Sequence, residues 1–195
     1  MVNYFKELPD GYIIDKVIDA KDDIKIKILF SILPMFIFTI VFLCFLPAII
    51  IKYKETPNAD NMTVALLILV VEMIVYVIFH ELTHGALYKI LTKEKLTYGF
   101  TLTVAYCGVP NLYLKKVPAL LAALAPLVVY SILFTVPLFF INDISYFIAT
   151  IILFSLHISG CIGDLYVSIL LIFKYNGKDV LVNDTGPKQT FYIKK

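Results

Sequence analysis

Four stretches of the chain are almost continuously apolar, and each is long enough to cross a lipid bilayer. They cover residues 28–51, 62–91, 117–141 and 146–173. A hydrocarbon core of about 30 Å needs about 20 apolar residues in a helix, which each stretch supplies. Pro34 and Pro47 lie inside the first stretch, where they predict kinks. The pattern predicts an all-α membrane protein with four transmembrane helices.

The segment between the second and third helices changes to a period of two. From Leu96 to Tyr106 every even position is apolar or aromatic, and the odd positions are small or hydroxylated. This alternation is typical of a strand with one apolar face. Turn residues at 107–111 precede Leu112-Tyr113-Leu114, which we expect to return as a second strand. The prediction is a short β-hairpin at the cytoplasmic interface, which either caps the helices or pairs with an extended substrate.

Composition supports a membrane protein. Apolar residues make up 60% of the chain and charged residues 16%, and the mean hydropathy of +0.86 is well above soluble values. All basic residues are lysine and the net charge is +2, which gives no reason to expect a nucleic-acid partner. Three scattered cysteines indicate no disulfide framework. We expect one domain over residues 1–195, a lipid bilayer around it, and a membrane protein or peptide as substrate; the oligomeric state is not indicated.

Lysines are distributed unevenly among the segments that flank the four helices. In chain order, these segments hold five, two, five, none and five lysines, with Lys89 near the end of the second stretch counted in the third segment. Positively charged loops of membrane proteins remain on the cytoplasmic side. We therefore expect a multi-pass protein of the cell membrane with both termini in the cytoplasm.

The second apolar helix contains His80-Glu81-Leu82-Thr83-His84. Residues four apart project from the same face of a helix, so both imidazoles can reach one ion. HExxH on a helix is a signature of zinc hydrolases, in which the two His are ligands and the Glu is the general base. The alternative is a chance match with two interfacial His on a core helix. We prefer the zinc site, with zinc as the cofactor.

A catalytic zinc site normally has three protein ligands, so a third must come from another helix at the same depth. Asp164 lies as far inside the fourth stretch as His80 lies inside the second. Both helices run inward, which places both residues about 27 Å from the outer ends. Ionisable residues inside membrane spans are rare and usually functional. Asp164 is the predicted third ligand; the alternative is a polar contact between helices.

Two further residues of the fourth stretch carry chemistry. His157 precedes Asp164 by two turns, about 10 Å, so the two are not expected to bind the same ion. Three roles stay open for His157: stabilising an oxyanion, donating a proton, or bonding a neighbouring helix. It is included as a candidate catalytic residue together with Glu81. Cys161 is either a thiolate ligand or, more commonly, a small buried thiol.

The predicted function is an intramembrane zinc metalloendopeptidase of the HExxH type. It would hydrolyse a peptide bond of a membrane-associated substrate near the cytoplasmic face. One alternative is a non-catalytic zinc-binding membrane regulator or scaffold, against which the presence of Glu81 argues. Another is a small transporter, but the chain shows no internal repeats of the kind that many transporters carry.

Taken together, these residues resemble the site-2 protease group of intramembrane zinc metalloproteases. More narrowly, they resemble a family of small, mostly bacterial membrane zincin peptidases. HELTHGALYK at 80–89 corresponds to the first motif, Ala125-Pro126 to an Ala-Gly-Pro-type turn, and Gly163-Asp164 to the position of the third ligand. The resemblance implies that three core helices carry the site. The chain departs from site-2 proteases at HISGCIGDLY, which lacks their Asn and the Gly after the Asp.

Overall fold

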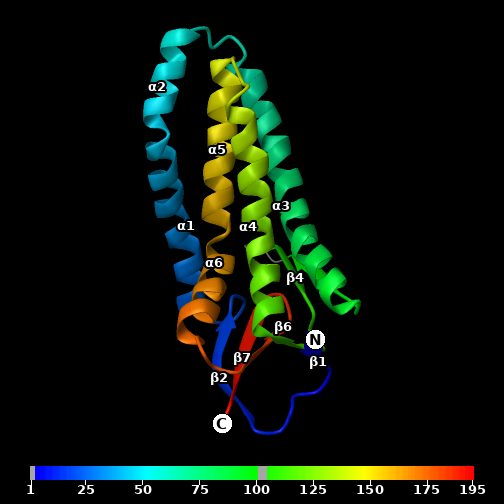
Figure 1. Ribbon diagram of the computed structural model, residues 1–195. Coiled ribbons are helices and arrows are strands. Elements are labelled where there is room, and N and C mark those ends of the chain that lie inside the picture. Colours follow the sequence, from blue (N-terminus) through cyan, green and yellow to red (C-terminus); the bar gives the residue numbers. More distant parts are fainter. Residues whose placement is uncertain (1–2, 101–104) are drawn as a thin grey trace. The chain divides into compact units, whose positions relative to one another are not determined.

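The computed structural model describes residues 3–100 and 105–195. Its helices are α1 (Ile24–Cys44), α2 (Leu46–Glu55), α3 (Met62–Thr92), α4 (Lys116–Leu138), α5 (Ile144–Gly160) and α6 (Ile162–Ile169), and a π-helical turn η1 (Leu170–Lys174) follows α6. The strands are β1 (Tyr4–Phe5), β2 (Tyr12–Asp19), β3 (Thr97–Phe100), β4 (Ala105–Gly108), β5 (Tyr113–Lys115), β6 (Val180–Asp184) and β7 (Lys188–Lys194). Figure 1 colours these elements in chain order.

The chain divides into two compact units, each assembled from separate segments. The sheet unit comprises Met1–Phe30, Ile78–Pro126 and Gly163–Lys195. The helical unit comprises Ser31–Val77 and Leu127–Ile162. The single domain expected over residues 1–195 stays a prediction.

Three helices, α1, α3 and α4, are long and apolar enough to cross a membrane. The bent combination of α5 with the helical segment 162–174 would supply a fourth span. The most apolar window of α1 has no buried residue, as expected of a surface that contacts lipid. The predicted helical stretches are confirmed, whereas the number of four spans stays a prediction.

Two of the predicted helices are interrupted. The first breaks at Phe45, and Pro47 then lies in the opening turn of α2, where proline leaves no helical hydrogen bond unmade. The fourth ends at Gly160 and resumes at Ile162, although the sequence pattern predicted one continuous helix. Gly160 and Gly163 flank this break, and glycine is a weak helix former.

The helical unit is packed through small residues and aromatic rings. Ala65 and Leu69 of α3 are buried against Ala149 and Leu153 of α5. Small residues of this kind let two helices approach closely where lipid offers no hydrophobic driving force. A second buried cluster surrounds Phe147 and includes Ile144 and Ile151 of the same helix, with side chains of α1 and α2 packed against it.

The sheet unit contains a five-stranded antiparallel sheet in the order β1-β5-β6-β7-β2. Strand β2 from the N-terminal segment pairs with β7 near the C-terminus, from Tyr12 opposite Lys194 to Asp19 opposite Lys188. Figure 1 shows β2 in blue beside β7 in red. The all-α prediction was therefore wrong for the charged terminal segments. Alternating residues around the turn at Thr185-Gly186-Pro187 are a hairpin signal that the sequence analysis did not use.

A β-hairpin does follow α3, but its pairing differs from the prediction. Strand β3 pairs with β4, so the hairpin closes within the stretch predicted as one strand; residues 101–104 lie outside the described part of the chain. Strand β5 joins β1 and β6 instead of returning to β3. The C-terminal segment holds the residues before β5, since the Asn183 side-chain amide donates to the carbonyls of Pro110 and Leu112 at 2.8 and 2.9 Å. The interfacial position of the hairpin stays a prediction.

The core of the sheet unit joins the sheet to the last helical segment. The Phe191 ring of β7 is stacked on the Tyr175 ring, with centroids 5.4 Å apart and planes 10° from parallel. Both residues are fully buried, together with Leu114 of β5 and Leu171 of η1. The Tyr175 hydroxyl donates to the Asp15 carboxylate of β2 at 2.7 Å, which links the same helical segment to the edge strand.

Replacing Phe191 with alanine is expected to lower the free energy of unfolding by about 3–5 kcal/mol, because a buried aromatic ring is removed and a cavity remains. Thermal unfolding of the purified full-length protein in detergent measures the change. Phe140→Ala is the matched control, since the Phe140 ring is 76% exposed. Equal losses in the two variants would contradict a core centred on Phe191.

Candidate metal centre

Helix α3 presents both histidines of the motif from its last four turns. The imidazole centroids of His80 and His84 lie 5.0 Å apart with their planes 75° from parallel. The two residues are 8% and 9% exposed. A one-turn separation on a continuous helix therefore produces the paired imidazoles that the sequence predicted.

Asp164 reaches both imidazoles from the first turn of α6. Its Oδ2 lies 3.2 Å from the Nε2 of His80, and its Oδ1 lies 3.3 Å from the Nε2 of His84. The start of a helix carries a partial positive charge that stabilises a carboxylate there. The structure thus brings together the three residues that the sequence analysis selected as ligands.

Two of the three separations among these residues are compatible with a zinc ion. Ligands at about 2.0–2.1 Å from a tetrahedral ion are about 3.4 Å from one another. The two observed separations of 3.2 and 3.3 Å are close to this value. Ligand atoms of His80, Glu81 and His84 also lie within 4.8 Å of one another. Two imidazole nitrogens with carboxylate oxygen form a donor set that zinc accepts.

The second ring nitrogen of His84 is held by the backbone of α4. Its Nδ1 lies 2.8 Å from the carbonyl oxygen of Ala122. A carbonyl can only accept, so Nδ1 carries the proton and donates it. The Nε2 atom then faces Asp164 and is the one available to a metal. Hydrogen bonds of this kind orient histidine ligands in many metal sites.

Gly85 allows the hairpin to lie against the motif helix. A Cβ atom at Gly85 would lie 1.9 Å from the hydroxyl oxygen of Tyr98, far inside van der Waals contact. Tyr98 belongs to β3, where it stands opposite Cys107 of β4. Burial raises the pKa of the Cys107 thiol to about 12, so this cysteine stays protonated at neutral pH. The absent side chain of Gly85 lets β3 lie beside the motif.

Sequence reasoning missed a buried hydrogen-bond pair one turn beyond the motif. The Tyr88 hydroxyl donates to Asp184 Oδ2 at 2.6 Å, and the Gln189 side chain donates to the same oxygen at 3.1 Å. The backbone amide of Gly186 donates to Asp184 Oδ1 at 2.8 Å. Asp184 is 4% exposed. The pair attaches α3 to the C-terminal hairpin; the position of Tyr88 four residues after His84 was the available signal.

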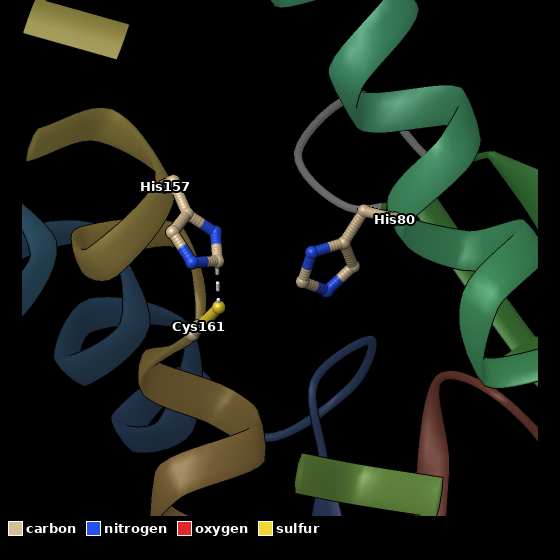
Figure 2. Close-up of side chains that lie close together, drawn as sticks. All are labelled: His80, His157 and Cys161. Carbon is tan, nitrogen blue, oxygen red and sulfur yellow. Dashed lines mark hydrogen bonds between the residues drawn. The ribbon is translucent and has the colours of Figure 1, made fainter. Parts of the chain in front are cut away.

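His157 and Cys161 belong to the helical unit, where they bond to its other side chains. The Tyr76 hydroxyl lies 2.9 Å from His157 Nδ1, and the Ser131 hydroxyl lies 3.2 Å from Nε2. Cys161 Sγ lies 3.6 Å from Nδ1, the contact that Figure 2 marks with a dashed line. Tyr76, Tyr130, Phe134 and Phe154 turn their rings edge-on to this imidazole. His157 therefore bonds neighbouring helices, and its catalytic role stays a prediction.

The fold and the site define a chain with apolar helices long enough to cross a membrane and an HExxH helix whose donor atoms zinc accepts. Residues 73–178 match the model of the family described as "Putative zincin peptidase", which is more than half of the 195 residues. The chain belongs to this family, and membership indicates a zinc metalloprotease. No curated protein and no solved structure matches the chain.

Asp184 predicts a pH dependence of stability. Burial raises the pKa of its carboxyl to about 6, whereas an aspartate in an unfolded chain titrates near pH 4. Between about pH 4 and pH 6 the folded protein holds a proton that the unfolded chain has released, so the free energy of unfolding falls as the pH rises through this range. Chemical unfolding at a series of pH values measures this slope.

Asp184→Asn is the control, because asparagine keeps an acceptor for Tyr88 and removes the titration. The slope between about pH 4 and pH 6 is expected to flatten in this variant. An unchanged slope would assign the pH dependence to another group.

Proposed function

We propose that this protein is an intramembrane zinc metalloendopeptidase that hydrolyses a peptide bond of a membrane-associated substrate near the cytoplasmic face. The contact of both motif imidazoles with the Asp164 carboxylate is the observation that carries the proposal. Family membership supports the zinc peptidase class, and the three long apolar helices support the membrane setting. The alternation of lysine-rich and lysine-poor segments supports cytoplasmic termini.

The distances support the ligand roles. His80 and His84 would bind zinc through Nε2, and Asp164 would bind through its carboxylate, since its oxygens lie 3.2 and 3.3 Å from those nitrogens. When bound, zinc lowers the pKa of a coordinated water toward neutrality and polarises the substrate carbonyl. Three protein ligands leave a fourth position open, as catalytic zinc sites require.

Glu81 is proposed as the general base. Its side chain comes from the turn between the two imidazoles, and one of its carboxylate oxygens lies within 4.8 Å of a ring nitrogen of each. Glu81 would take a proton from the attacking water and return it to the leaving amine, which balances the hydrolysis.

The hairpin is proposed as the surface that receives the substrate. Among the described residues, β3 and β4 form a sheet of two strands, so each has one edge that this sheet leaves open. Tyr98 of β3 packs against Gly85, directly after the motif. An extended peptide that pairs with a strand edge here would be held beside Glu81 by main-chain hydrogen bonds.

Glu81→Gln is expected to keep its zinc and to lower peptide hydrolysis by about 10²- to 10⁴-fold, because the amide cannot accept the proton. Zinc content of the purified protein and release of a labelled peptide in detergent measure the two effects. Glu94→Gln is the matched control, since Glu94 pairs with Lys6 at the surface. Its Oε1 lies 2.8 Å from the Nζ of Lys6. A wild-type protein that binds zinc without hydrolysing any peptide would favour the regulator or scaffold.

Asp164→Asn is expected to lose both zinc and activity, since the neutral amide is a much poorer ligand than the carboxylate. Metal analysis after dialysis measures the zinc that remains. Asp143→Asn is the control: Asp143 caps α5 through the amide of Ser145, and asparagine caps helices equally well. Full zinc content in the Asp164 variant would move the third ligand to another residue.

A further inference from the structure

Pro126 occupies the interior of α4, where proline is unfavourable. The helix runs from Lys116 to Leu138, and Pro126 is among its fully buried residues. Proline has no amide hydrogen, so it cannot bond the carbonyl four residues earlier, and its ring presses against that carbonyl. The carbonyl four residues before Pro126 is that of Ala122.

The Ala122 carbonyl is also the group that accepts the hydrogen bond from His84 Nδ1, at 2.8 Å. In a regular helix this oxygen would point along the axis and bond the amide of residue 126. The proline removes that competing donor and turns the oxygen outward, toward a neighbouring helix. Ala122 and Ala123 are buried and small, so α3 can come close enough for the bond to form.

We propose that Pro126 is a positioning residue for the metal centre: it frees the Ala122 carbonyl, which then orients His84 toward the ion. The inference rests on the proposed function in so far as His84 is a zinc ligand. Pro126 acts through the backbone and does not touch the metal. The proton on Nδ1 is fixed by the carbonyl, and this keeps the lone pair of Nε2 directed at the position between the ligands.

The first test measures zinc affinity of the purified full-length protein by competition with a chelator. Pro126→Ala restores an amide that competes for the Ala122 carbonyl, so binding is expected to weaken by about 10- to 100-fold, as for other losses of a bond that supports a metal ligand. Affinity equal to that of the wild type would overturn the inference.

Two prolines of the same helix are matched controls, and both are expected to leave zinc affinity unchanged. Pro118 is buried but lies in the first turn of α4. Pro118→Ala therefore also removes a buried ring, but the new amide has no carbonyl partner within the helix. Pro137→Ala restores an amide near the other end of α4. A loss in Pro118→Ala as large as in Pro126→Ala would reduce the effect to packing and overturn the inference.

The second test needs no metal. The chain has three histidines, so a sample labelled with ¹⁵N at histidine shows three imidazoles, which His80→Gln and His157→Gln variants assign. The Nδ1 proton of His84 is expected to exchange slowly with water in the wild type and faster in Pro126→Ala, with Pro137→Ala unchanged. Equal exchange in all three would overturn the inference. If the wild type binds no zinc, the proposed function is contradicted. The exchange rate of the His84 Nδ1 proton still tests the role of Pro126 in that case.

Discussion

The contact between two imidazoles of α3 and one carboxylate of α6 constrains the positions of the helices that carry them. It joins His80 and His84 to a residue about eighty positions later in the chain, at 3.2 and 3.3 Å. Buried polar groups in apolar surroundings are unfavourable unless they find partners. Because the partners are fixed on helices, α6 must begin where α3 presents its histidines. The break at Cys161 meets this requirement by starting a new helix two residues before Asp164.

Hydrogen bonds hold the motif helix from two further sides. His84 is bonded to the backbone of α4 through Ala122, and Tyr88 is bonded to β6 through Asp184. Gly85, between them, leaves space for Tyr98 of the hairpin. A metal site needs ligands whose own orientations are fixed by such contacts. In this protein the four-residue repeat of α3 supplies two proposed ligands, His80 and His84, and then the supporting Tyr88 along one stripe.

Much of the site could be predicted from the sequence because its chemistry is local. The HExxH motif selects two candidate ligands by helix periodicity, and equal depth in two apolar stretches selected Asp164 as the third. The hydrogen bonds that support the motif helix were harder to predict from the sequence. The bond from His84 to Ala122 depends on which carbonyl lacks an amide, and the bond from Tyr88 to Asp184 depends on a sheet that pairs both ends of the chain. The terminal segments are rich in lysine, so they resembled solvated tails, although their alternating residues were compatible with strands.

The hairpin shows more clearly that contacts distant in sequence are hard to predict. Alternation identifies strand character but does not choose the partner, because pairing is decided by contacts distant in sequence. Leu112 to Leu114 had the correct character, yet the amide of Asn183 and the edge of β6 determined where this segment lies. The three proposed ligands, Glu81, Ala122 and Asp184 all belong to the sheet unit. A zinc ion would therefore join two separate segments of that unit, so that metal binding and the folding of the sheet are thermodynamically coupled.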